Sequence, residues 1–134
     1  MEKIVILFAL PGKLRNEDQI LQTFQKNSLS FAVSRSLPEL FSQIKNIERP
    51  VLIVADFASI LDGTKDISCY DQFLHGYSLI QNERHHKAIL IIVHPIVREH
   101  VENFVGYGNL VDGFIRQPLQ PEMLLGLIER IPTK

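Results

Sequence analysis

Four short stretches of this chain are apolar almost throughout instead of alternating with polar residues. They are KIVILF at 3–8, PVLIVAD at 50–56, KAILIIV at 87–93 and VDGFIR at 111–116. Continuous runs of this kind, rich in Val and Ile, are typical of β-strands that are covered on both faces. A weaker run, LSFAVSR at 29–35, alternates and predicts an edge strand. A sheet buried on both faces needs helices above and below it, so these runs constrain the fold more than any other feature.

Amphipathic helical patterns separate the predicted strands. Asn16, with Gln19 three residues further on, is predicted to cap the first helix, and Ser36 is predicted to cap the second. The five predicted helices cover 16–26, 36–47, about 69–84, a segment after Pro95 and a segment after Pro121. The alternation predicts a single α/β domain over residues 1–134, a (βα)5 three-layer α/β/α sandwich with right-handed crossovers between parallel strands.

The third strand is followed by FASILDGTKDIS, residues 57–68, which we predict to be a long loop. In open parallel sheets ligands bind beyond the carboxyl ends of the strands, where the winding reverses direction. For the flavodoxin-like strand order 2-1-3-4-5, that point lies between the first and third strands. Phe8 and Ala9 end the first strand and Asp56 ends the third. The Asp56 carboxylate is therefore the strongest chemical signal in the sequence.

Several motifs resemble the CheY-like receiver domain of two-component response regulators, over essentially the whole chain. PVLIVAD is similar to the family's third strand, whose terminal aspartate accepts a phosphoryl group from a histidine kinase, and this places the phospho-acceptor position at Asp56. DGFIRQP is similar to the fifth-strand signature, with Phe114 at the aromatic position and Gln117 at the position of the lysine before proline. The resemblance implies a turn at Gln117 and Pro118 through a cis peptide bond.

The chain departs from the family at the positions that carry the chemistry. KIVILFALP matches the first-strand motif in spacing, but Phe8 and Ala9 replace its two acidic residues. The small hydroxyl residue that ends the fourth strand is missing, since His94 and its neighbours stand there, and neutral Gln117 replaces the lysine. Mg²⁺ is usually anchored by carboxylates, so we expect no metal site and no cofactor, with Mg²⁺ only if Asp56 is phosphorylatable.

Two interpretations of Asp56 remain open at this stage. An aspartate at the end of a strand can cap the following segment through neighbouring amide groups. It can equally retain an altered regulatory role, in which His94, at the end of the fourth strand, pairs with it. With the metal ligands replaced, Phe8 can fill part of the pocket.

The composition excludes several other classes of function. The 14 basic and 15 acidic side chains nearly cancel and form no basic run, so nucleic-acid binding is not expected. The apolar opening, about seven residues long, is too short for a membrane span and lacks a signal-peptide pattern. Cys69 is the single cysteine, which excludes an internal disulfide and fits a cytoplasmic protein. No catalytic triad motif is visible, so we do not expect an enzyme.

The leading hypothesis is an atypical receiver (a pseudo-receiver) in two-component phosphorelay signalling that binds another signalling protein or a copy of itself. The resemblance implies that the partner surface is the face built from the fourth helix, fifth strand and fifth helix. Tyr107 and Arg116 are expected to be exposed on this face, and Phe114 to be buried or to move between states.

Two alternatives belong to different classes. One is a switch that a histidine kinase still phosphorylates, with Mg²⁺ held by Asp56 and loop residues such as Asp62 or Asp66. The other is a small-molecule-binding module of flavodoxin-like architecture, with a pocket lined by Phe8, Ala9 and the same loop.

Overall fold

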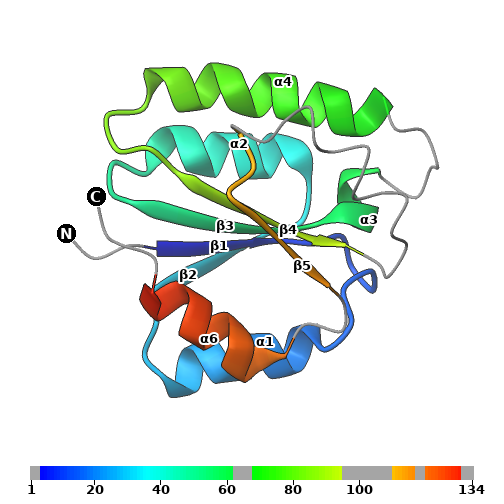
Figure 1. Ribbon diagram of the computed structural model, residues 1–134, viewed down its shortest axis with the longest axis vertical. Helices are drawn as coiled ribbons and strands as arrows, with labels where there is room; N and C mark the ends of the chain where they lie inside the picture. The colour runs from blue at the N-terminus through cyan, green and yellow to red at the C-terminus, as the bar shows by residue number, and fades with distance from the viewer. Residues whose placement is uncertain (1–3, 62–67, 95–109, 117–119, 131–134) are drawn as a thin grey trace.

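A five-stranded parallel sheet forms the centre of the molecule in the computed structural model, which describes residues 4–61, 68–94, 110–116 and 120–130 (Figure 1). The strand order is β2-β1-β3-β4-β5, as predicted. The strands are β1 (Ile4–Phe8), β2 (Phe31–Ser34), β3 (Val51–Asp56), β4 (Ile89–His94) and β5 (Gly113–Arg116). All residues of β1 and β3 are buried, which confirms that the continuous apolar runs are covered on both faces.

Helices cover both faces of this sheet. The described helices are α1 (Glu17–Lys26), α2 (Leu37–Asn46), α3 (Phe57–Ile60), α4 (Ser68–Glu83) and α6 (Pro121–Arg130). In Figure 1, α2, α3 and α4 lie on one side of the sheet, and α1 and α6 lie on the other. This arrangement confirms the predicted three-layer sandwich. The helix that we predicted after Pro95 lies outside the described residues.

Each face of the sheet carries its own hydrophobic core. Because side chains alternate along a strand, Ile6 and Phe8 of β1 point to the α2–α4 side, whereas Leu7 and Ala9 point to the α1–α6 side. The core on the α2–α4 side includes Leu40, Ile44, Phe57, Tyr70, Phe73 and Tyr77. The core on the α1–α6 side includes Ile20, Phe24, Leu124 and Ile128. The end of β1 therefore contributes one side chain to each layer.

One of the two predicted helix caps is confirmed and the other is wrong. The Ser36 hydroxyl accepts a hydrogen bond of 3.2 Å from the Glu39 backbone N–H, as predicted. Asn16 does precede α1, but its side chain makes no capping hydrogen bond. Its backbone is left-handed, with φ of 63°, whereas a capping side chain needs an extended backbone to reach the first amides of the helix.

The prediction of one long loop over 57–68 is also wrong. The turn of helix α3 starts at Phe57, directly after β3, and α4 already begins at Ser68. Phe57, Ile60 and Leu61 bury their side chains in the core on the α2–α4 side. This burial, together with a cap from Asp56, gives the start of the segment a fixed helical structure.

Candidate functional site

The Asp56 carboxyl group is completely buried at the carboxyl end of β3, with a relative exposure of 0%. β3 is the central strand of the sheet, and Asp56 is in register with Val93 of β4. A buried carboxylate is costly unless hydrogen bonds compensate for the lost water. The contacts of Asp56 therefore determine what this site can do.

Ser59 holds the Asp56 carboxylate through two hydrogen bonds. Oδ2 of Asp56 accepts one bond of 3.1 Å from the Ser59 backbone N–H and another of 2.6 Å from the Ser59 hydroxyl. The first bond makes Asp56 the cap of α3, so the predicted capping role is confirmed. The length of the second bond is typical of a hydroxyl that donates to a carboxylate.

The same hydroxyl also connects Asp56 to the segment after β1. Ser59 Oγ accepts a hydrogen bond of 2.8 Å from the Leu10 backbone N–H, and Ser59 itself is 1% exposed. Sequence reasoning missed Ser59. The available signal was the spacing of Asp56 and Ser59, because the residue three positions after a helix cap presents its N–H to the cap.

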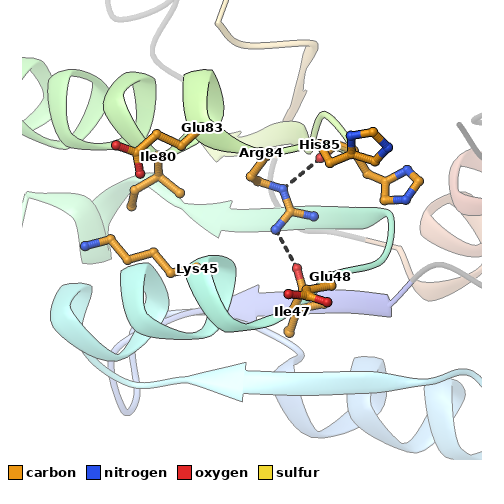
Figure 2. Close-up of a pocket in the computed structure, with 8 residues that line it drawn as sticks. Lys45, Ile47, Glu48, Ile80, Glu83, Arg84 and His85 are labelled. Atoms are coloured by element: carbon orange, nitrogen blue, oxygen red, sulfur yellow. Dashed lines mark hydrogen bonds between the residues drawn. The ribbon is translucent and has the colours of Figure 1, made fainter.

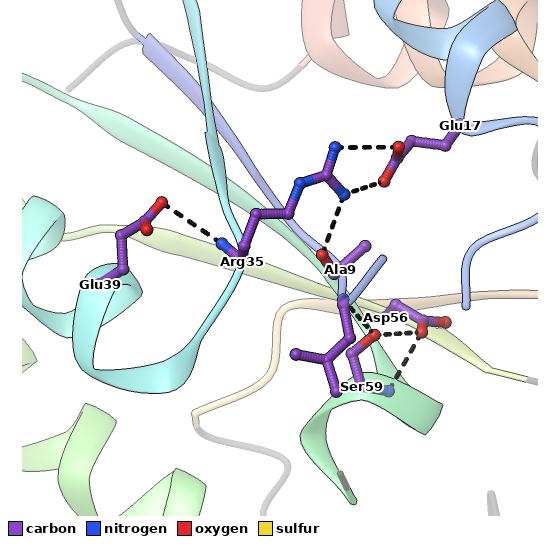
Figure 3. A network of polar contacts seen from close by, with 7 residues as sticks. Ala9, Glu17, Arg35, Glu39, Asp56 and Ser59 are labelled. Carbon is purple, nitrogen blue, oxygen red and sulfur yellow. Dashed lines mark hydrogen bonds and ion pairs between the residues drawn. The ribbon is translucent and has the colours of Figure 1, made fainter. Parts of the chain in front are cut away.

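Arg35, which follows β2, holds the other side of the same segment (Figure 3). Its Nη1 donates a hydrogen bond of 3.1 Å to the Ala9 carbonyl, and its guanidinium forms an ion pair with Glu17 of α1, including an Nη2–Oε2 bond of 3.0 Å. The Glu17 carboxylate raises the pKa of the Arg35 guanidinium above its ordinary value. Neither residue was singled out from the sequence.

Phe8 and Ala9 are both completely buried, and their side chains carry no oxygen that could bind a metal ion beside Asp56. Phe8 lines a hollow of about 230 Å³ at this end of the sheet. Asp56 is not among the residues that line it, so the filling of the Asp56 pocket by Phe8 stays a prediction. The other lining residues are Leu10, Ser36, Leu37, Pro38 and Ser59. Ala9 is not among them, because it points to the opposite layer.

The donor set around Asp56 does not fit Mg²⁺, which needs several oxygen ligands in an octahedral shell. Phe8 and Ala9 stand where acidic residues were looked for, and both are apolar. One carboxylate oxygen of Asp56 already accepts two hydrogen bonds from Ser59. In the part of the chain that the structure describes, no group of three or more His, Cys, Asp or Glu side chains could hold a metal ion. Asp62 and Asp66, which the switch hypothesis uses, lie outside the described residues.

The remaining predicted positions are described only in part. His94 ends β4 and pairs in register with Arg116 of β5, but both side chains lie outside the described residues. Tyr107, Gln117 and Pro118 also lie outside them. The His94–Asp56 pair, the cis peptide bond and the exposure of Tyr107 and Arg116 therefore stay predictions. Phe114 is partly buried and packs against the core on the α2–α4 side.

A larger hollow of about 550 Å³ lies between the ends of α2 and α4, before β3 and β4 begin (Figure 2). Arg84 is one of several polar residues that line it, and burial lowers the pKa of its guanidinium. The guanidinium donates to the carbonyls of Ile44 at 2.5 Å, Ile47 at 2.8 Å, Arg49 at 2.7 Å and His86 at 2.8 Å. The bonds to Ile44 and Ile47 satisfy carbonyls at the end of α2, and those to Arg49 and His86 hold the segments before β3 and β4, so Arg84 has a structural role there.

None of the described helices is long and apolar enough to cross a membrane. No protein-family model matches the chain, and no curated protein matches it either.

Solved structures do resemble the chain over nearly its whole length. A CheY-like response regulator receiver domain protein from Methanospirillum hungatei has a TM-score of 0.62 at 17% identity, with 96% of this chain and 91% of that chain covered. The chemotaxis response regulator CheY4 of Vibrio cholerae has a TM-score of 0.62 at 12% identity, with 97% and 98% covered. An adenylate cyclase from Rhodopirellula baltica has a TM-score of 0.64 at 15% identity, with 96% and 86% covered.

At these identities the similarity concerns the fold. The strand order is the one predicted from the sequence, and the match covers at least 96% of this chain and 91% of each receiver domain. The chain therefore has the fold of the CheY-like receiver domains of response regulators.

Proposed function

We propose that this chain is a signalling module with a receiver fold that binds another protein, or a second copy of itself, without phosphorylation of Asp56. The observation that carries the proposal is the enclosure of Asp56. Its side chain is completely buried, and Oδ2 accepts both hydrogen bonds from Ser59. A module with a receiver fold can still present a surface to a partner when its aspartate is not phosphorylated.

The chemistry of phosphoryl transfer supports this proposal. Transfer to a carboxylate requires an open line of attack on phosphorus and a cation that neutralises the donor oxygens. Phe8 and Ala9 offer no ligand to such a cation, and Gln117 carries no charge that could replace it. The proposal accordingly includes no cofactor and no reaction of the module's own.

A protein is the proposed partner because the charges of the chain nearly cancel, which disfavours a nucleic acid. The proposed surface is the one around β5 and α6. Met123 of α6 is a large apolar side chain that is 64% exposed, and Phe114 of β5 is only partly buried. Exposed apolar and aromatic side chains of this kind anchor protein interfaces.

The proposal can be tested with beryllofluoride, a phosphoryl mimic that binds phospho-accepting aspartates together with Mg²⁺. Amide NMR spectra would be recorded for the wild type and for Asp56→Asn, with and without the mimic. We expect the wild-type spectrum to stay unchanged, and self-association measured by sedimentation to be the same in both proteins. Shifts that occur in the wild type and are absent in Asp56→Asn would instead favour the phosphorylatable switch.

The hollow of about 230 Å³ supports a second candidate, a site for a small neutral molecule. Its lining is mostly apolar, and its two hydroxyls, from Ser36 and Ser59, already take part in hydrogen bonds. The volume is below the range of about 300–1,000 Å³ of most ligand pockets, so only a small ligand would fit. A thermal-shift screen with small aromatic and branched aliphatic compounds tests it, with Leu37→Trp as the variant that fills the hollow.

A further inference from the structure

The peptide group between Ala9 and Leu10, directly after β1, is held at both of its polar atoms. Its carbonyl oxygen accepts a hydrogen bond of 3.1 Å from Arg35 Nη1. Its N–H donates a hydrogen bond of 2.8 Å to Ser59 Oγ. Figure 3 shows the Arg35 side chain reaching Ala9 from the segment after β2, and Ser59 lying below it on α3. We call these three groups, the Ala9–Leu10 peptide, Arg35 and Ser59, the peptide clamp.

Each of the two side chains in the peptide clamp also contacts a carboxylate. Ser59 donates its hydroxyl proton to Asp56, and Arg35 forms an ion pair with Glu17. The two ends differ in their access to water. Asp56 is completely buried, whereas the side chains of Arg35 and Glu17 are 38% and 18% exposed. The clamp thus joins a buried carboxylate to a partly exposed ion pair between Glu17 of α1 and Arg35, the residue after β2.

The hydroxyl of Ser59 has a single proton, and this fixes the direction of the hydrogen bonds. Because the proton goes to Asp56, a lone pair of Oγ is directed at the Leu10 N–H. A peptide group that donates and accepts at once is polarised by both bonds, so each bond strengthens the other. Loss of one bond is therefore expected to weaken the bond on the opposite side of the peptide.

We propose that the peptide clamp couples the buried Asp56 carboxylate to the surface pair of Arg35 and Glu17, so that a change at either end alters the other. Such coupling is reciprocal, since it is a property of the shared equilibrium. It places the surface that responds to Asp56 at the β2–α1 edge. This inference does not depend on a protein partner or on phosphorylation.

Hydrogen exchange of the Leu10 amide, measured by NMR, tests the coupling. Ser59→Ala removes the acceptor and is expected to speed exchange of this amide by about tenfold, whereas Ser59→Thr, which keeps a hydroxyl, restores protection. The decisive variant is Glu17→Gln, because Glu17 touches neither Leu10 nor Ser59 in any described contact. We expect it to speed Leu10 exchange by roughly threefold or more through Arg35.

Two controls separate this effect from a general loss of stability. Glu122→Gln removes the same charge from the first turn of α6, and should leave Leu10 exchange unchanged. The buried amide of Ile53 reports global opening in every variant. Leu10 exchange that is the same in Glu17→Gln as in the wild type would overturn the proposal. This comparison needs no Ser59 variant, so it decides the question even if Ser59→Ala does not fold.

Discussion

Ser59 donates its hydroxyl proton to the Asp56 carboxylate at 2.6 Å, and both side chains are buried from solvent. The Asp56 carboxylate at the carboxyl end of β3 is thus held by a side chain of the helical turn that it caps. This pair explains how the Asp56 carboxylate can be buried, because hydrogen bonds from Ser59 replace those that water would make. It also leads to a first prediction about stability.

Ser59→Ala should lower the free energy of unfolding by about 1–3 kcal/mol, because it leaves the Leu10 N–H without its acceptor and removes one bond to Asp56. The matched control is Ser42→Ala, since Ser42 is exposed on α2 and accepts only a long bond of 3.4 Å from Asn46. Its effect should stay within about 0.5 kcal/mol. Urea unfolding of both variants provides the comparison, and equal losses would contradict our assignment of Ser59.

Phe8→Ala should cost about 3–5 kcal/mol of unfolding free energy, because the Phe8 ring is completely buried in the core on the α2–α4 side. Phe31→Ala is a suitable control, since this ring lies on the edge strand β2 and is only partly buried. It should cost clearly less. If the two variants lost the same stability, Phe8 would not be the core residue that the structure shows.

The hydroxyl of Tyr77 is buried and makes no hydrogen bond in the described part of the chain. Burial, reinforced by the Asp112 carboxylate, raises the pKa of this phenol above its ordinary value of 10.0. The folded state therefore keeps the proton at pH values where the unfolded state has lost it. The free energy of unfolding is therefore unaffected by this titration below about pH 10, and it falls as the pH rises from there through the folded-state pKa.

Tyr77→Phe tests both parts of this description. At neutral pH it should be neutral or stabilising by up to about 1 kcal/mol, because it removes a buried hydroxyl that has no partner. Phenylalanine does not titrate. Above about pH 10, the free energy of unfolding should therefore fall less steeply with pH in the variant than in the wild type. Strong destabilisation at neutral pH would show that the hydroxyl does have a bonding partner.

Arg84→Lys should destabilise the protein by about 1–3 kcal/mol, although it keeps the positive charge. A lysine has no planar fork with which to reach the carbonyls of Ile44, Ile47 and Arg49 together. Arg15→Lys is the control, because Arg15 is exposed. Chemical denaturation of both variants is the measurement, and an Arg84→Lys variant as stable as Arg15→Lys would refute the structural role of the guanidinium.

The architecture was predictable from the sequence because it depends on the burial of apolar side chains. The continuous runs at β1, β3 and β4 have one simple solution, a parallel sheet between two layers of helices. The cap at Ser36 was predictable because it is a local contact between residues three positions apart in the sequence.

The polar contacts of the site were not predictable in the same way. Arg35 reaches Ala9 across 26 positions of the chain, and Leu10 reaches Ser59 across 49, and no periodic pattern records such pairs. The capping prediction for Asn16 failed because its backbone is left-handed, and a residue type does not reveal that conformation. Asp56 was identified from the sequence, but its partner Ser59 was hidden in a segment that we took for a loop.

The central claim is that the enclosed Asp56 does not accept a phosphoryl group. The most direct measurement is the intact mass of the wild type after incubation with acetyl phosphate and Mg²⁺, beside Asp56→Asn treated in the same way. Our account predicts the unmodified mass for both proteins in folded samples. A phosphoryl adduct on the wild type that is absent from Asp56→Asn would contradict it, and would show that the bonds from Ser59 open far enough for Asp56 to react.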